Sequence, residues 1–390
     1  MKLAPLVQVV AELTTAEISR YSRHLLLPEV GFDGQRRLKS SRVLVIGAGG
    51  LGSPVLLYLA AAGVGTLGIV EFDVVEESNL QRQIIHGMSD IGISKAVSAK
   101  ASISEINPHV EVNVHHLRLE ADNALAIVEE YDLIVDGTDN FATRYLINDA
   151  CMLTGKPYVW GSIFRFEGQA SVFWEQAPGG VGLNYRDLYP EPPPPEEAPS
   201  CAEGGVFGIV CASIGAIMAT EVIKLITGIG ETLLGRLAIY DALDMSFRFV
   251  PLRRDTHRRP IAVLEDYRAF CGLKADHVHE HQEVATINAS KLKRWLDSGF
   301  DFELIDVREA VEWAIVRIPS ARHIPKNRVI SRTVFTQLDR TKPIVLHCKS
   351  GARSRKVLLT LQKKGFTNLI NFDGGILAWI REIDPTLPVY

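Results

Sequence analysis

The sequence is poor in cysteine and contains no Cys-x-x-Cys pair. Its five cysteines are widely spaced, at positions 151, 201, 211, 271 and 348. This usage argues against a disulfide framework and excludes a zinc site built from two Cys-x-x-Cys pairs. The sequence also lacks an excess of basic residues, since it contains 42 Lys and Arg residues and 46 Asp and Glu residues. We therefore predict no general affinity for nucleic acid.

Patterns typical of secreted or membrane-spanning chains are also lacking. The first residues reach the acidic Glu12 without a cleavage pattern, so we predict no signal peptide and expect a cytoplasmic location. No charged residue lies between Arg42 and Glu71, but seven glycines interrupt that run and favour a buried strand, helix and strand. A second uncharged run, 204–220, predicts a buried helix. We expect no membrane association.

Short apolar runs alternate with helical periods over the first half of the chain. This alternation predicts an α/β fold with a parallel sheet covered on both faces. The expected strands are 42–47, 66–72, 110–115 and 132–138, and the expected helices are 51–63, 94–107 and 122–131.

The pattern changes after Pro157 and again near residue 255. Two closely spaced strand signals, YVWGSI and QASVFW, predict antiparallel additions to the sheet, and the proline-rich segment 189–200 predicts an exposed crossing loop. Residues 285–390 repeat the α/β alternation on a smaller scale. We predict a Rossmann-like mixed-sheet domain at 1–255, a linker at 256–284 and a smaller α/β domain at 285–390.

A glycine-rich segment follows the first predicted strand and opens a helix. In GAGGLGS (47–53) the glycines allow a tight turn, and a helix N-terminus favours a phosphate. Glu71 ends the next strand, where a carboxylate can bind ribose hydroxyls. Taken alone, this pattern fits a dinucleotide site equally well.

Further polar residues favour chemistry at a nucleotide phosphate. Arg and Lys neutralise charge that develops on phosphates, and a carboxylate can hold Mg²⁺. Each residue lies at or just beyond a strand or at a helix start, where open α/β sheets bind ligands. These residues are Ser78, Asn79, Arg82, Lys95, Asp139 and Asn140.

Several motifs resemble the ubiquitin-activating (E1-like) adenylyltransferases of the MoeB/ThiF group. They are RYSRH (20–24), GAGGLGS (47–53), EFDVVEESNLQRQ (71–83), GxxK ending at Lys95, DGTDN (136–140) and FEGQ (166–169). The resemblance implies ATP binding by Gly50, Glu71, Ser78, Asn79, Arg82, Lys95 and Asn140, and Mg²⁺ binding by Asp139. It also implies a homodimer in which Arg23 enters the ATP site of the neighbouring subunit.

One family feature is absent. Members of this group such as MoeB carry structural zinc on two Cys-x-x-Cys pairs, and the corresponding stretches here are roughly 181–184 and 258–261. Neither contains a cysteine. We therefore predict no zinc.

A second candidate site lies in PIVLHCKSGARSRK (343–356). Cys348 stands where a buried strand meets a helix, and loop N–H groups, the helix N-terminus and Arg353 lower a thiol pKa. The polar loop argues against burial of Cys348. Tyrosine-type phosphatases place five residues between cysteine and arginine, whereas Cys348 and Arg353 enclose four. Arg355 misses that spacing by one residue, so a phosphatase stays as an alternative.

Together with LIDVRE (304–309), RIPSARHIP (317–325) and FDGGILAW (372–379), this loop resembles a rhodanese, a sulfurtransferase that carries a cysteine persulfide. The fusion of the two domains is similar to the MoeZ/MoeBR type of sulfur-carrier activating enzyme. That resemblance implies a ubiquitin-like sulfur-carrier protein (MoaD, ThiS or CysO type) ending in Gly-Gly as the partner. Its carboxylate would be adenylated and then converted to a thiocarboxylate, with sulfur from thiosulfate or a cysteine desulfurase persulfide.

Cys201, in PSCAEGG, matches the catalytic cysteine position of E1-like enzymes and would release the thiocarboxylate. Two other interpretations stay open. One is a Rossmann-type nicotinamide oxidoreductase with a regulatory second domain. The other is an adenylyltransferase whose second domain only binds, with an inert Cys348.

Overall fold

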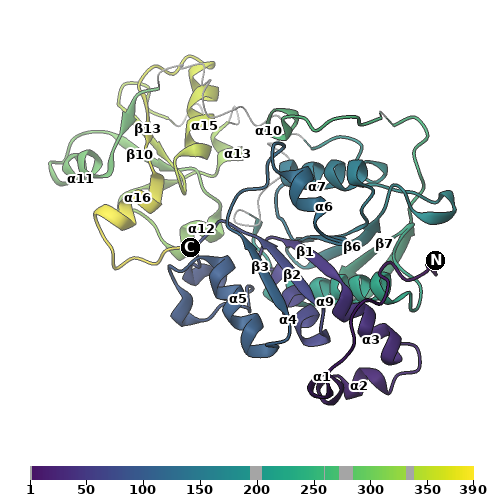
Figure 1. Cartoon of the computed structure of the whole chain (residues 1–390). Helices are drawn as coiled ribbons and strands as arrows, with labels where there is room; N and C mark the ends of the chain where they lie inside the picture. The colour runs from purple at the N-terminus through teal and green to yellow at the C-terminus, as the bar shows by residue number, and fades with distance from the viewer. Residues whose placement is uncertain (1, 194–203, 259, 272–283, 331–337) are drawn as a thin grey trace. The chain divides into compact units, whose positions relative to one another are not determined.

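The computed structural model describes the chain apart from residues 1, 194–203, 259, 272–283 and 331–337 (Figure 1). The chain forms two compact units, Met1–Ala275 and Asp276–Tyr390, each built around a sheet of its own. The predicted fold class, a Rossmann-like mixed sheet followed by a smaller α/β domain, is confirmed.

The first unit contains an eight-stranded sheet in the order β3-β2-β1-β4-β5-β6-β7-β8. Strands β1 to β5 are parallel, and β6 to β8 are added antiparallel. The strand bounds are Arg42–Ile46 (β1), Thr66–Val70 (β2), Glu111–His115 (β3), Leu133–Asp136 (β4), Tyr158–Phe164 (β5), Glu167–Phe173 (β6), Arg236–Asp241 (β7) and Ser246–Pro251 (β8).

Helices flank this sheet (Figure 1). Their bounds are Thr15–Arg20 (α1), Ser22–Leu25 (α2), Gly31–Ser40 (α3), Gly52–Ala62 (α4), Lys95–Ile106 (α5), Ala124–Glu129 (α6), Phe141–Thr154 (α7), Gly208–Thr227 (α9) and Tyr267–Phe270 (α10). Short 3-10 turns lie at Glu77–Asn79 (η1), Met88–Asp90 (η2), Pro178–Gly180 (η3) and Tyr185–Asp187 (η4).

The charge-free run between Arg42 and Glu71 forms β1, α4 and β2, as predicted. Strands β1 and β2 pair in parallel from Arg42↔Thr66 to Ile46↔Val70, and every residue of β2 is buried. Glycine 63 ends α4 in the left-handed conformation, with φ of 84°. The glycines therefore serve the turns of a β-α-β unit within a buried sheet.

Helix α9 is long and apolar enough to cross a membrane by length and composition. More than half of its apolar stretch is buried inside the first unit, where it packs against α3, α4, β5 and β6. The predicted buried helix at 204–220 is therefore present, but its bounds are later in the chain. Its apolar character is explained by this core position.

The second unit contains a five-stranded parallel sheet in the order β11-β10-β12-β13-β9. Strand β12, which leads to Cys348, lies at the centre of this sheet. The bounds are Thr286–Ile287 (β9), Glu303–Asp306 (β10), Arg322–His323 (β11), Ile344–His347 (β12), Leu369–Phe372 (β13), Ala289–Asp297 (α11), Ala310–Ile315 (α12), Lys326–Val329 (α13), Ala352–Gln362 (α15) and Gly375–Glu382 (α16).

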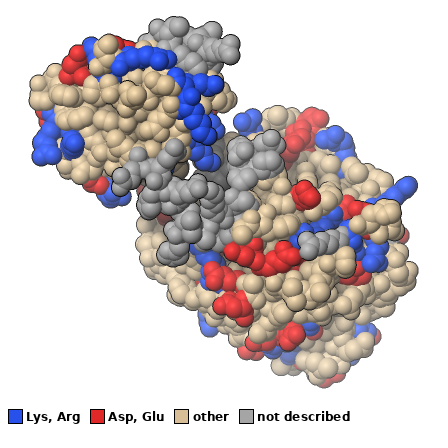
Figure 2. Space-filling model, turned by 90° about the horizontal axis from the view of Figure 1, so that it is seen from above, with Lys and Arg blue, Asp and Glu red and all other residues tan. Residues whose placement is uncertain are grey.

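Charge on the face shown in Figure 2 is mixed. Lys and Arg side chains there lie among Asp and Glu side chains and large uncharged areas. This view agrees with the near balance of 42 basic and 46 acidic residues in the sequence.

Candidate functional sites

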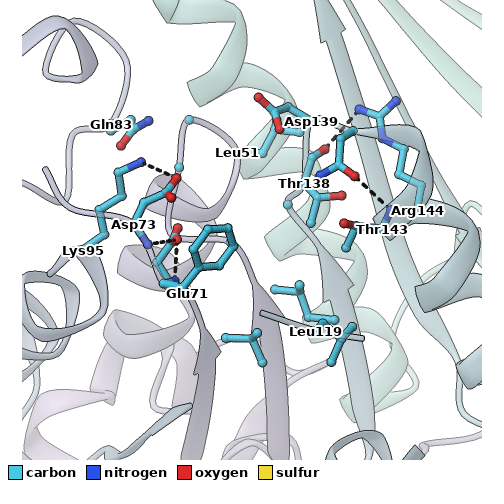
Figure 3. A pocket seen from close by; sticks show the side chains of 18 of the residues that line it. Leu51, Glu71, Asp73, Gln83, Lys95, Leu119, Thr138, Asp139, Thr143 and Arg144 are labelled. Carbon is cyan, nitrogen blue, oxygen red and sulfur yellow. Dashed lines mark hydrogen bonds and ion pairs between the residues drawn. The ribbon is translucent and has the colours of Figure 1, made fainter. Parts of the chain in front are cut away.

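The first candidate site is a cavity of about 190 Å³ at the carboxyl ends of β1, β2 and β4. Strand order reverses between β1 and β4. Strands β2 and β3 lie on one side of β1, whereas β4 and β5 lie on its other side. Such a reversal opens a crevice above the sheet in α/β folds. Most of the lining comes from the glycine-rich loop after β1, the segment after β2, and the segment that joins β4 to α7 (Figure 3).

Close approaches require the glycines of the loop. Gly47 has φ of 93°, and a Cβ atom on Gly52 would lie 1.9 Å from the carbonyl oxygen of Gly47. A Cβ atom on Gly50 would lie 2.9 Å from Sγ of Cys211, at the start of α9. The loop therefore fits tightly between its own turn and α9, and α4 begins at Gly52 directly beyond it.

Glu71 lines the cavity, but its carboxylate already binds three backbone N–H groups. Oε2 accepts from Ala48 at 3.0 Å, and Oε1 accepts from Phe72 at 2.8 Å and Asp73 at 2.9 Å. Glu71 therefore ties the end of β2 to the glycine-rich loop. A carboxylate has about four acceptor positions, so these bonds leave room for a ribose hydroxyl.

Cations line the side of the cavity next to β2. Lys95 is 7% exposed and pairs with Asp73 at 3.4 Å (Figure 3). Arg82 donates to the carbonyl oxygen of Ser78 at 3.0 Å, and Arg118 stacks on the ring of Phe72. Sequence reasoning missed Asp73 and Arg118 as lining residues, although the motif that contains Glu71 also contains Asp73.

The opposite wall follows β4. Asp139 is exposed, and its carboxylate makes no hydrogen bond or ion pair within the described residues. Asn140 caps the start of α7, where its side-chain oxygen accepts the N–H of Thr143 at 2.9 Å. Arg144, also missed from the sequence, donates to the carbonyl oxygen of Thr138 at 3.1 Å (Figure 3). Asp139 is therefore available to a cation.

Three of the predicted ATP-site residues do not line this cavity in the described part of the chain. Ser78 and Asn79 form the turn η1, in which Asn79 Oδ1 accepts the N–H of Glu76 at 3.3 Å. Arg23 is exposed on α2. An exposed position leaves Arg23 accessible to a second subunit, as the predicted role requires. Cys201 lies outside the described residues.

The second candidate site is the loop between β12 and α15. The thiol of Cys348 accepts the N–H of Gly351 at 3.2 Å and lies 3.6 Å from the hydroxyl of Ser354. The carbonyl oxygens of Cys348 and Lys349 accept N–H groups of Ile376 and Leu377, at 2.9 Å and 3.2 Å. These bonds fasten the outer side of the loop to the start of α16.

The motif FDGGILAW packs directly against this loop. A Cβ atom on Gly375 would lie 2.4 Å from the carbonyl oxygen of Cys348. The expectation that the polar loop keeps Cys348 exposed was wrong, because Cys348 is only 1% exposed. The backbone bonds to α16 draw the loop into the fold.

Arg353 is held by a carboxylate that sequence reasoning missed. Its guanidinium donates to both oxygens of Glu312, at 2.6 Å and 2.7 Å. Glu312 also accepts from the Tyr390 hydroxyl at 3.0 Å, and that hydroxyl accepts from Arg308 at 2.6 Å. Burial acts to raise the pKa of Glu312, but its bonds to Arg353 and its other donors outweigh burial and lower it.

His347 precedes Cys348 and is fully buried on β12. Its Nε2 lies 3.6 Å from Oδ2 of Asp306, and burial lowers its pKa to about 4. It is therefore neutral at pH 7.

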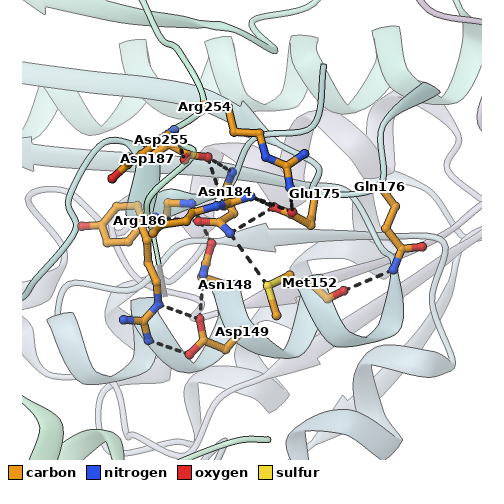
Figure 4. A network of polar contacts seen from close by, with 12 residues as sticks. Asn148, Asp149, Met152, Glu175, Gln176, Asn184, Arg186, Asp187, Arg254 and Asp255 are labelled. Carbon is orange, nitrogen blue, oxygen red and sulfur yellow. Dashed lines mark hydrogen bonds and ion pairs between the residues drawn. The ribbon is translucent and has the colours of Figure 1, made fainter. Parts of the chain in front are cut away.

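A cluster of ion pairs lies around the stretches 181–184 and 258–261, for which the sequence predicts no zinc (Figure 4). Arg258 pairs with Glu175 and, at 3.1 Å, with Asp187, while Arg254 pairs with Glu175 at 2.9 Å. Asn184 donates to the same Glu175 carboxylate at 3.1 Å. Guanidinium groups do not bind zinc, so these side chains do not fit the metal. They join the segment 175–187 to the segment 254–258 through direct side-chain contacts.

We expect Glu175→Gln to lower the free energy of unfolding of the first unit by about 1–3 kcal/mol, because Arg258 would lose a partner in a largely buried cluster. Thermal and denaturant unfolding measure this loss. Asp33→Asn is the control, since Asp33 forms an exposed pair with Arg36 at 3.6 Å and should matter by about 0.5 kcal/mol or less. A chelator that destabilises the wild-type chain would contradict this account.

Comparison with known families decides between the interpretations. The ThiF family matches residues 21–260, and the rhodanese-like domain matches residues 288–382. The chain belongs to the ThiF family. A ThiF-family chain with a rhodanese-like domain is the predicted combination, and the oxidoreductase interpretation is not favoured.

Relatives of known name cover the whole chain. It is 58% identical over 388 residues to the "probable adenylyltransferase/sulfurtransferase MoeZ" of Mycobacterium tuberculosis, covering 100% of this chain and 99% of the relative. It is 41% identical to the "adenylyltransferase and sulfurtransferase MOCS3" of Sus scrofa, over 97% and 89% of the two chains. The chain is thus an enzyme, an adenylyltransferase and sulfurtransferase, and the recognition made from its motifs is confirmed.

Solved structures agree on the fold of the first unit. Escherichia coli MccB in complex with AMPCPP and MccA has a TM-score of 0.54 and 23% identity, and covers 62% of this chain and 73% of its own. PaaA has a TM-score of 0.53 and 23% identity, covering 63% and 76%. At this identity the likeness supports the fold alone.

Proposed function

We propose that the first cavity binds MgATP and adenylates the C-terminal carboxylate of a ubiquitin-like sulfur-carrier protein that ends in Gly-Gly. The carboxylate oxygen attacks the α-phosphorus, and pyrophosphate leaves. The glycine-rich loop with Gly50 holds the phosphates, and Arg82 and Lys95 neutralise charge on them. Asp139, whose carboxylate has no partner in the described residues, holds Mg²⁺.

The remaining predicted residues take supporting roles in this proposal. Glu71 binds the ribose while it holds the loop, and Asn140 lies beside the metal. Ser78 and Asn79 shape the turn that presents Arg82. Arg23 completes the site of the second subunit in a homodimer. The reaction depends on positioning and charge neutralisation more than on a protein base.

Cys348 carries the sulfur in the second step. Its persulfide, loaded by thiosulfate or by a desulfurase persulfide, attacks the acyl-adenylate carbon and displaces AMP. The product is an acyl disulfide. A second thiol, for which we propose Cys201, then attacks Sγ of Cys348, forms a Cys201–Cys348 disulfide and releases the carrier thiocarboxylate. A reductant such as a dithiol protein restores both thiols.

The bounds 1–255, 256–284 and 285–390 describe these two activities and the linker between them, and we place the enzyme in the cytoplasm. One observation carries the proposal: a cavity with a glycine-rich loop, cations and a free carboxylate is joined in one chain to a cysteine loop seated on a helix start.

The test is the intact mass of a Gly-Gly-terminated carrier after a single turnover with a stoichiometric amount of enzyme, MgATP and thiosulfate. We expect a gain equal to one sulfur minus one oxygen, with AMP formed in step. A reaction without ATP is the control. AMP without the mass gain would overturn the sulfur-transfer step, and no AMP with any carrier would overturn adenylation.

A further inference from the structure

Two side chains, Glu71 and His86, hold the peptide groups on both sides of Ala48 in the glycine-rich loop. The N–H of Ala48 donates to Glu71 Oε2 at 3.0 Å, and its carbonyl oxygen lies 3.0 Å from His86 Nε2. Ala48 is fully buried, and Glu71 and His86 are each 7% exposed. Only Glu71 of the two holding side chains lines the cavity. His86 therefore acts on the loop from outside the binding space.

The orientation of the His86 ring is itself fixed. Its Nδ1 lies 2.8 Å from the hydroxyl of Ser98, on α5, and this hydroxyl lies 2.8 Å from Oδ2 of Asp90. The same carboxyl oxygen accepts the N–H of Gly87 at 2.7 Å. A carbonyl oxygen only accepts, so Nε2 must carry the proton that binds Ala48. The contacts of Asp90 and Ser98 with His86 therefore hold the ring so that its Nε2–H is directed at the glycine-rich loop.

Peptide geometry carries this effect to the cavity. The carbonyl of Ala48 and the N–H of Gly49 belong to one planar trans peptide and point in opposite directions. Since His86 draws the carbonyl away from the cavity, the N–H of Gly49 is turned toward it. Gly49 lines the cavity, and its N–H and that of Gly50 have no hydrogen-bond partner among the described residues.

We propose that His86 is a positioning residue for nucleotide binding: by holding the Ala48 carbonyl, it keeps the Gly49 N–H directed at a phosphate of ATP. This inference rests on the proposed adenylation at the same cavity. Backbone N–H groups at a helix start are effective phosphate donors only when they converge on the ligand. A buried carbonyl that loses its donor is free to rotate, and this rotation would turn the Gly49 N–H away.

The experiment measures affinity for Mg²⁺ with α,β-methylene-ATP by calorimetry, together with carrier-dependent AMP formation. For His86→Leu we expect about tenfold weaker nucleotide affinity and a matching rise in KM for ATP. His86→Gln keeps an N–H donor of similar reach and should restore most of the affinity.

A neighbouring variant separates positioning from general stability. The hydroxyl of Ser102, also on α5, donates to the carbonyl oxygen of Ile85 at 2.6 Å, next to His86 but away from the glycine-rich loop. Ser102→Ala should lower the melting temperature without changing nucleotide affinity. If His86→Leu does the same, the inference is overturned. If the wild-type chain itself fails to bind the nucleotide, the proposed adenylation fails first.

Discussion

Asp139→Ala is expected to reduce carrier-dependent AMP formation by about 10³-fold, since a bound metal ion contributes several kcal/mol of charge stabilisation to phosphoryl chemistry. Asp139 is exposed and has no side-chain partner among the described residues, so the variant should keep its melting temperature. Release of pyrophosphate and AMP measures the effect, at saturating carrier and varied Mg²⁺.

Asp122→Ala is the matched control, because Asp122 is an exposed carboxylate outside the lining of the nucleotide cavity. It should retain full activity. Should Asp139→Ala keep more than a tenth of the wild-type rate, the magnesium assignment would be wrong.

Lys95 tests the cationic side of the same cavity. Its removal would leave Asp73, which is 54% exposed in its side chain and stays hydrated, so the fold should tolerate the change. We expect Lys95→Ala, like Asp139→Ala, to lose AMP formation. Lys100→Ala should keep it. Lys100 lies on the same helix, is exposed, and donates to the carbonyl oxygen of Val112 at 3.1 Å.

The strands, the glycine-rich loop and several cavity residues of the first unit could be predicted, because each depends on local sequence. Glycines, apolar runs and strand-end residues such as Glu71 and Asp139 lie where parallel β-α-β geometry brings strand ends together. The bounds of helix α7 were not predicted from the sequence. It buries Asn148 and Asp149, polar residues that blur its helical pattern. Besides the neighbouring Asn148, the donors to Asp149 are Arg186 and Tyr267, which lie 37 and 118 residues away in sequence.

The site residues that were missed also depend on contacts between residues far apart in sequence. Arg118 reaches the cavity from the segment after β3, and Glu312 reaches Arg353 across 41 residues. Neither contact leaves a local pattern. Burial of Cys348 was mispredicted because a polar loop reads as exposed, whereas backbone bonds to α16 decide its position. Local sequence thus indicates which chemistry is present, and tertiary contacts decide how each group is held.

The sharpest separation of the two activities comes from Cys348→Ala. This variant should form acyl-adenylate and release pyrophosphate as the wild-type chain does on a first turnover, because Cys348 belongs to a unit with its own sheet and core. Thiocarboxylate formation should fall by about 10³-fold or more, since no other group is expected to carry the sulfur. Intact mass of the enzyme after thiosulfate treatment should show one added sulfur in the wild type and none in the variant.

Cys151→Ala is the appropriate control for this experiment. Cys151 lies in α7, and burial raises the pKa of its thiol well above the usual value, so it stays protonated and unreactive. Its removal should leave sulfur loading and transfer intact. If Cys348→Ala still yields thiocarboxylate at more than a tenth of the wild-type rate, the rhodanese-like domain would be a binding module and the sulfur would reach the acyl-adenylate by another route. Loss of pyrophosphate release in the same variant would instead show that the loop of Cys348 takes part in adenylation.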